Sequence, residues 1–101
     1  MTSQLAGLAP IHPGEILRED VIPGCALSKA EFARRLDMSR EALNNILAGK
    51  TAITPLTALK LSRLLSTTPD LWLNLQQRYD LAAVSKAKAA QISQVRVLEI
   101  A

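Results

Sequence analysis

Apolar residues recur along this chain at three- and four-residue intervals, in five segments separated by short polar stretches. That spacing places the apolar side chains on one face of an α-helix, so it predicts an all-α fold of five helices around one core. The apolar side chains at these positions are Ile16, Leu17, Val21, Ile22, Phe32, Ala33, Leu36, Leu43, Ile46, Leu47, Leu56, Leu59, Leu61, Leu64, Leu65, Leu71, Trp72, Leu75, Tyr79, Ala82 and Ala83.

Two of the predicted helices follow each other closely within Ser28–Lys50. Ser28 and Glu31 have the Ser-x-x-Glu spacing of a capping box, in which each side chain binds the backbone N–H of the other residue. Ser39 can cap the second helix, and Gly49 can end it. Two short helices joined by a tight turn predict a helix-turn-helix, whose second helix enters the major groove of DNA.

The flanking helices have recognisable boundaries as well. Pro13 and Glu15 suit the first turn of a helix, and Pro23-Gly24 should end that helix. Thr54-Pro55 and Thr68-Pro69 each combine a capping threonine with a proline at the first helical position. The helix that starts at residue 55 is apolar on nearly every side, so we expect it at the centre of the core.

Trp72 and Tyr79 lie seven residues apart, two turns along one side of the last predicted helix, with Leu75 between them. Each could pack in the core or anchor a partner surface, because large aromatic side chains also dominate interface energetics. The core is the better interpretation for Trp72, whereas the two interpretations are equal for Tyr79.

Composition narrows the class of protein. The 101 residues suffice for one domain, and 49% hydrophobic with only 3% aromatic residues requires a mainly aliphatic core. Cys25 is the only cysteine, which excludes an intrachain disulfide and leaves its role open. No apolar run approaches the ~18 residues of a membrane span, and the N-terminus lacks a signal-peptide pattern, so we expect a cytoplasmic protein.

Candidate catalytic or metal-binding residues are sparse. His12 is the only histidine and precedes Glu15 by three residues, a pairing that suggests a metal ligand or acid–base chemistry. A lone histidine without a second histidine or a paired cysteine makes a poor site, so helix capping is the better interpretation. We therefore expect no enzyme, no metal and no cofactor.

The net charge of +3 is mildly basic, and the basic side chains gather in the predicted helix-turn-helix. Within residues 28–50 the basic residues outnumber the acidic ones. Within residues 1–27 the acidic residues are in excess, because Arg18 is the only basic residue. The cations of the helix-turn-helix are Lys29, Arg34, Arg35, Arg40 and Lys50, and its anions are Glu31, Asp37 and Glu41. This distribution permits a nucleic-acid partner.

Short polar groups dominate the outward face of the second helix of this motif. They are Arg40, Glu41, Asn44 and Asn45. Arginine can bind guanine, and asparagine adenine, through two hydrogen bonds each. The flanking residues suited to phosphate contacts are Ser28, Lys29, Lys50 and Thr51. A helical protein-interaction module with solvated polar faces is the alternative that this pattern leaves open.

The two ends of the chain differ. Residues 1–10 lack periodicity, which predicts a loose tail. Residues 84–101 fit a strand or a helix equally well. They carry too much apolar surface to remain uncovered, so we expect this extension to pair with something, a second copy of the chain included. The apolar side chains concerned are Ile92, Val95, Val97, Leu98 and Ile100.

Two motifs flank the helix-turn-helix: IHPGEILRE at residues 11–19, and TPDLWLNLQ at residues 68–76, continued by Tyr79-Asp80-Leu81. Together they strongly resemble the HigA-type antitoxins, small Xre (Cro/CI-like) helix-turn-helix proteins also known as virulence-associated protein I. The resemblance covers about residues 11–83, and it implies a five-helix, lambda-repressor-like domain that works as a homodimer. It also implies binding to palindromic operator DNA in its own promoter and neutralisation of a HigB toxin, a RelE-like mRNA-cleaving ribonuclease.

The resemblance further implies roles for individual residues. The last helix and the residues after it would supply much of the dimer contact. The implied base-reading residues are Ser39, Arg40, Asn44 and Asn45, with Lys29 and Lys50 near phosphates.

The chain departs from the family pattern at two positions. Asp37 stands where many relatives have a glycine in the left-handed conformation, and Lys29 stands where glutamine is frequent. Asp37 should therefore give a slightly strained turn. A stand-alone repressor of the same fold, without a toxin partner, is the alternative within this family.

Overall fold

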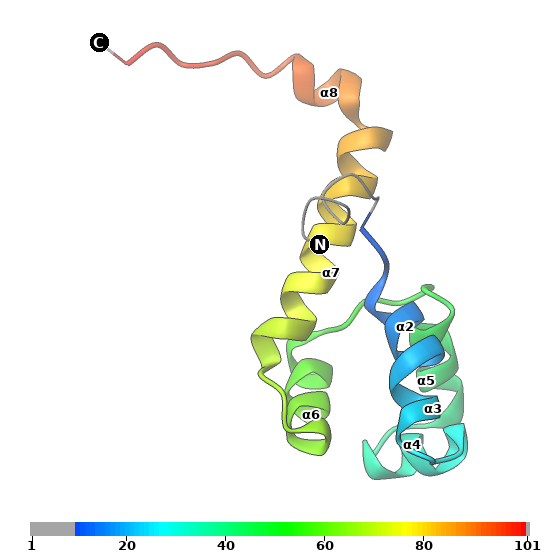
Figure 1. Cartoon of the computed structure of the whole chain (residues 1–101). Coiled ribbons are helices and arrows are strands. Elements are labelled where there is room, and N and C mark those ends of the chain that lie inside the picture. Colours follow the sequence, from blue (N-terminus) through cyan, green and yellow to red (C-terminus); the bar gives the residue numbers. More distant parts are fainter. Residues whose placement is uncertain (1–9, 101) are drawn as a thin grey trace.

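Helices account for most of the structure, a computed structural model that describes residues 10–100. Five successive helices and a short sixth one follow one another from residue 13 to residue 93, and residues 10–100 contain no strand (Figure 1). The predicted all-α fold is therefore confirmed. Apart from Pro10, the tail predicted over residues 1–10 lies outside the described residues.

The first helix is continuous but wider in its middle. It consists of α2 (Pro13–Ile16), the π-helical turn η1 (Leu17–Val21) and α3 (Ile22–Gly24). The N–H of Ile22 binds the carbonyl of Leu17, five residues back rather than four. Pro23 accounts for this widening, because a proline has no N–H to donate and its ring clashes with the carbonyl four residues earlier.

The helix-turn-helix consists of α4 (Lys29–Arg35) and α5 (Arg40–Leu47). Ser28 Oγ accepts the N–H of Glu31 at 3.1 Å, and Ser39 Oγ accepts the N–H of Ala42 at 3.0 Å, so both predicted caps are confirmed. The predicted capping box is only half correct. The Glu31 carboxylate binds two arginines of its own helix, because these cations are stronger partners than the N–H of Ser28.

Helices α6 (Pro55–Leu65) and α7 (Pro69–Ala87) pack against each other and begin at the predicted Thr-Pro pairs. The prediction that α6 is central to the core is wrong. Ala58 and Leu61 are buried, but Leu56 and Leu59 are 63% and 56% exposed. Helix α6 lies at the side of the bundle, where it packs chiefly against α7 (Figure 1).

The core is aliphatic apart from Phe32 and Trp72. Trp72 is 3% exposed and donates its indole N–H to Thr67 Oγ1 at 2.9 Å, which confirms its assignment to the core. Leu75 and Tyr79 are half-buried. The buried apolar residues are Leu17, Ile22, Phe32, Ala33, Leu36, Leu43, Ile46, Leu47, Ile53, Ala58, Leu61 and Trp72.

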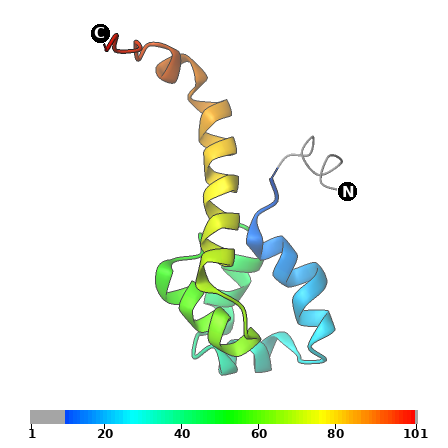
Figure 2. The ribbon, with the colours of Figure 1, turned by 60° about the vertical axis from the view of Figure 1, so that its left-hand side comes forward.

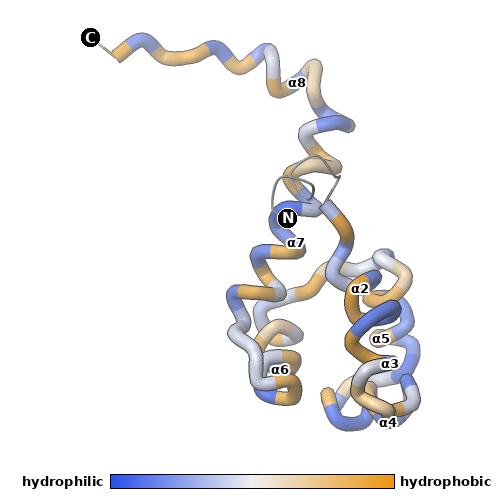
Figure 3. The backbone as a smooth tube through the Cα atoms, in the orientation of Figure 1, coloured by the Kyte–Doolittle hydropathy of each residue, from blue (hydrophilic) through white to orange (hydrophobic). Residues whose placement is uncertain are grey.

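The C-terminal part of the chain projects from the bundle. Helix α7 continues through Ala87, the short helix α8 (Ala89–Ser93) follows, and residues 94–100 have no regular structure (Figure 2). Of the two structures considered for residues 84–101, the helical one is therefore correct as far as residue 93. Apolar positions continue along this projection (Figure 3), and its side chains are exposed from residue 84 to residue 100.

Two further findings answer questions that the sequence left open, on membrane-spanning helices and on Cys25. No helix within the described residues is long and apolar enough to span a membrane. Cys25 follows α3 and is half-buried against the core, as a small residue near a turn would be.

Candidate nucleic-acid interface

Helix α5 has one buried face and one exposed face. Its apolar side chains Leu43, Ile46 and Leu47 are at most 6% exposed, so the position and rotation of the helix are fixed by the core. Of the predicted base-reading residues, Asn45 is half-buried, and the others are exposed: Ser39, Arg40, Glu41 and Asn44. Asn45 is thus the least accessible member of the predicted set.

The outward side chains of α5 have hydrogen-bonding capacity that no other described residue uses. Within residues 10–100, no hydrogen bond or ion pair involves the side chains of Arg40, Glu41, Asn44 or Asn45. Arginine and asparagine can each form two hydrogen bonds to one base edge in the major groove. The exposed face of α5 is therefore chemically suited to reading bases.

Residues suited to phosphate contacts stand at both ends of the motif. All four predicted ones are exposed, namely Ser28, Lys29, Lys50 and Thr51. The Ser28 hydroxyl accepts the N–H of Glu31 as a helix cap, and its own proton remains available for donation to a phosphate oxygen. The arrangement places polar donors before α4 and after α5.

The outer face of α4 holds a cluster of one carboxylate and two guanidinium groups. Glu31 accepts hydrogen bonds from Nε of Arg34 and from Nε of Arg35, both at 3.0 Å, and pairs with a second nitrogen of Arg34. The hydrogen bonds from Arg34, and next those from Arg35, lower the pKa of Glu31 from 4.5 to about 2. Much of the positive charge of these two arginines is therefore balanced locally.

The turn between α4 and α5 has the left-handed backbone conformation that the family resemblance implies. Asp37 has a φ of 53°, in the left-handed region where glycine is favoured. Its carbonyl oxygen accepts a hydrogen bond from Lys60 Nζ of α6 at 3.1 Å. A cation from outside the motif thus contacts the turn that leads into the N-terminus of α5.

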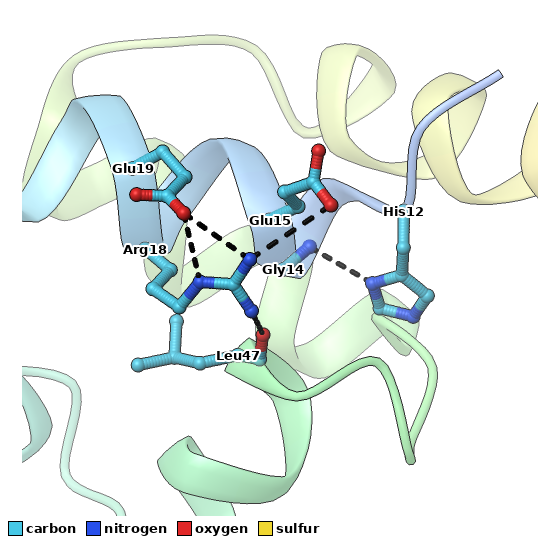
Figure 4. Close-up of polar contacts among 6 residues, drawn as sticks. All are labelled: His12, Gly14, Glu15, Arg18, Glu19 and Leu47. Carbon is cyan, nitrogen blue, oxygen red and sulfur yellow. Dashed lines mark hydrogen bonds and ion pairs between the residues drawn. The ribbon is translucent and has the colours of Figure 1, made fainter.

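A second residue from outside the motif binds the backbone at the C-terminal end of α5. Arg18 Nη1 donates to the carbonyl oxygen of Leu47 at 2.9 Å, and the same guanidinium pairs with Glu15 and Glu19 (Figure 4). The sequence did not single out Arg18 as a site residue, because the contact spans 29 positions and leaves no local pattern.

The residues of the two flanking motifs hold the helices together. His12 Nδ1 accepts the N–H of Gly14 at 2.9 Å, so His12 caps the first helix as predicted, and its ring packs T-shaped with that of Tyr79, with the ring centroids 5.0 Å apart. Gln76 is 5% exposed, and its Oε1 accepts the N–H of Ile53 at 2.8 Å. This role of Gln76 was not expected from the sequence, since a polar residue on a helix is normally assigned to its wet face.

The described residues do not bring metal-ligating side chains together: no three His, Cys, Asp or Glu residues there could hold a metal ion jointly.

Comparisons with known proteins agree with this geometry. A helix-turn-helix family model matches residues 25–72. An uncharacterized HTH-type transcriptional regulator of Haemophilus influenzae is 38% identical over 87% of this chain and 82% of its own length. Antitoxin GraA in complex with its operator is 40% identical, with a TM-score of 0.84 over 93% of this chain and 96% of that one. The Pseudomonas aeruginosa antitoxin HigA with the higBA promoter is 36% identical, with a TM-score of 0.83 over 89% and 99%.

These matches extend over almost the whole of both chains, beyond the helix-turn-helix itself. They include the first helix and α7, whose motifs carry the resemblance seen in the sequence. The chain belongs to the HigA-type, Xre-like family of helix-turn-helix proteins.

Proposed function

We propose that this protein is the antitoxin of a type II toxin–antitoxin pair. In this proposal it binds operator DNA as a homodimer, represses its own operon and neutralises a HigB-like, mRNA-cleaving ribonuclease. The observation that carries the DNA-binding part is the exposed face of α5, where bidentate donors and acceptors lie on a helix whose opposite face is locked into the core.

Within α5, Arg40 and Asn44 are the strongest candidates for direct base contacts. They lie four residues apart, so they share one face of the helix, and both are exposed. Arg40 would bind guanine O6 and N7, and Asn44 would bind adenine N6 and N7. Ser39 and Glu41 stand at the N-terminal end of the same helix, which enters the groove first. Asn45 would contribute less because it is half-buried.

Phosphate contacts would come from the two ends of the motif. Lys29 begins α4, and Lys50 and Thr51 follow the C-terminal end of α5. Such contacts fix the position of the protein on the duplex without reading its sequence. The proposal therefore separates residues that set specificity from residues that set affinity.

A homodimer is proposed because one reading helix contacts too few base pairs for a unique site. A two-fold dimer places two reading helices about one turn of DNA apart, roughly 34–36 Å. The projecting end of the chain offers apolar surface for this contact, with Leu81, Val84 and Ile92 each more than half exposed. The operator would then be a palindrome that matches the symmetry of the dimer.

Toxin neutralisation rests on the similarity to antitoxins GraA and HigA, which extends over nearly the full chain. We expect the toxin to meet the folded domain, because the C-terminal extension is too apolar to act as a polar toxin-wrapping arm. Hydrogen-exchange protection on addition of toxin should appear in the helices of residues 13–87. Protection confined to residues 88–100 would contradict this docking.

The direct test is binding to the promoter of the protein's own operon. Fluorescence anisotropy should show tight, salt-sensitive binding to a promoter fragment and much weaker binding to a shuffled duplex of the same length and composition. Equal affinity for both duplexes would contradict operator recognition. Absence of binding to either, at low salt, would instead favour a helical protein-interaction module.

A stand-alone repressor is the second candidate, and the similarity to a transcriptional regulator of Haemophilus influenzae favours it. The reading frame beside the gene separates the two functions. A small basic ribonuclease-like protein encoded next to it, which co-purifies with this chain and loses activity when bound, supports the antitoxin. The absence of such a neighbour supports the repressor.

A further inference from the structure

The last turn of α5 leaves one carbonyl for a side chain to satisfy. The following backbone N–H groups donate elsewhere: Ala48 to Asn44, Gly49 to Ile46, and Lys50 and Thr51 both to Asn45. The carbonyl of Leu47 receives its hydrogen bond from Arg18 Nη1 at 2.9 Å. Arg18, on the π-helical turn of the first helix, therefore completes the cap of the reading helix (Figure 4).

The surroundings of Arg18 argue against a direct contact with DNA. Its guanidinium lies 3.3 Å from the Glu19 carboxylate and 3.8 Å from that of Glu15. Two carboxylates against one guanidinium give the cluster a net negative charge, which would repel a phosphate. They hold the guanidinium in the orientation that points Nη1 at the carbonyl of Leu47 (Figure 4).

The carbonyl that Arg18 binds lies two residues before the left-handed Gly49 and three before Lys50. The turn after it, residues 48–51, is exposed. Its backbone is held by its bonds to the last turn of α5. Fixing the end of that helix from outside therefore limits how far the turn can move.

We propose that Arg18 is a positioning residue for DNA binding: it holds the end of α5 so that the following turn presents Lys50 and Thr51 to a backbone phosphate. This inference rests on the proposed function, since it concerns how the proposed phosphate contact is made. In contrast to a residue that contacts DNA directly, Arg18 would act through Lys50. Removing either residue should remove the same phosphate contact.

A double-mutant cycle tests this coupling. Arg18→Met keeps the aliphatic stem and removes the guanidinium, and Lys50→Ala removes the phosphate contact itself. Each single variant should bind the promoter fragment about tenfold more weakly, the scale of one charge-assisted hydrogen bond. Each should also reduce the slope of log K against log salt by about 0.9, the value for one phosphate contact. The double variant should be no worse than either single variant.

Lys60→Met is the matched control. It also removes one positive charge and one side-chain bond to a backbone carbonyl, but at the opposite end of α5. Its effect on binding should add to that of Lys50→Ala, because it does not act through the 48–51 turn. Arg18→Lys, which can still donate to Leu47, should recover part of the affinity that Arg18→Met loses.

The outcomes separate the two proposals. If wild-type protein binds the promoter but the effects of Arg18→Met and Lys50→Ala add, Arg18 contacts DNA itself or acts only through stability, and the inference fails. If wild-type protein does not bind its promoter, the proposed function fails first. Measurements are made where circular dichroism shows every variant to be fully folded, so that loss of fold does not imitate loss of binding.

Discussion

Gly14 lies so close to α5 that a methyl group on its Cα would stand 1.8 Å from the carbonyl oxygen of Ile46. The same methyl would be 2.8 Å from the carbonyl carbon of Ile46 and 3.0 Å from His12 Nδ1. The first helix and α5 therefore meet backbone to backbone. No side chain larger than hydrogen fits at position 14 unless one of the helices moves.

Gly14→Ala should consequently destabilise the protein, by at least the roughly 1–3 kcal/mol typical of overpacking. The free energy of unfolding, measured by urea denaturation, checks this. Gly24→Ala is the matched control, because a Cβ at Gly24 meets nothing within 4 Å. That control should be neutral or stabilising by up to about 1 kcal/mol, since alanine is a better helix former than glycine. Equal losses in both variants would contradict the close contact.

Gln76 should stabilise the fold through the hydrogen bond that it accepts, and not only through the space that its side chain fills. Gln76→Met keeps the length of the side chain but leaves the buried N–H of Ile53 without its partner. The expected loss of unfolding free energy is about 1–3 kcal/mol. The neighbouring exposed residue gives the control, Gln77→Met, which should change stability by less than about 0.5 kcal/mol. Similar values for the two variants would show that the bond to Ile53 is unimportant.

The Glu31 cluster should make stability depend on pH in the acid range. Arg34 and Arg35 lower the pKa of Glu31 to about 2 in the folded state, from 4.5. A group whose pKa is lower in the folded state stabilises the fold above its unfolded pKa and loses this contribution as the pH falls. The difference in unfolding free energy between wild type and Glu31→Gln should therefore be constant above about pH 4.5 and vanish towards pH 2.

Glu41→Gln controls for the loss of a negative charge without loss of an ion pair, because within the described residues Glu41 makes none. Denaturation series at several pH values measure both differences. A Glu31→Gln difference that does not change between pH 4.5 and pH 2 would contradict the pairing with the two arginines.

Base-reading and phosphate-contacting residues should differ in the way their removal affects binding. Arg40→Ala or Asn44→Ala should reduce discrimination at one operator position by roughly 1–3 kcal/mol. Lys50→Ala should weaken binding to all duplexes alike and reduce the salt slope by about one unit. Anisotropy titrations with single-base operator variants, at several salt concentrations, measure both quantities. Identical behaviour of the two kinds of variant would refute this division of roles.

Local signals in the sequence predicted the helices well because each depends on residues a few positions apart. Ser28, Ser39, Thr54 and Thr68 all cap helices through their own hydroxyls, as their positions before apolar runs indicated. Asp37 takes the left-handed conformation that the family pattern implied. Signals of this kind need no knowledge of how the helices pack.

Contacts between distant residues could not be predicted in the same way. Arg18 meets Leu47, and Gln76 meets Ile53, across 29 and 23 positions, and neither pair forms a periodic pattern. The exposure of Leu56 and Leu59 has the same origin, because apolar spacing identifies a helix but not how many sides its neighbours cover. The candidate base contacts were partly predictable. Helical geometry alone places Arg40 and Asn44 outward, but it does not show what they contact.

The wide turn in the first helix has a consequence for side-chain direction. Leu17 and Ile22 are both buried although they are five residues apart, a separation of about 140° around a regular α-helix. The π turn absorbs the extra residue and brings the two side chains back to the same side. The first helix can thus bring Gly14 and Arg18 against α5 and still point Ile22 into the core. Deleting a single residue between Leu17 and Ile22 would leave them four positions apart, about 40° around a regular α-helix, so both side chains could then point inward without a π turn.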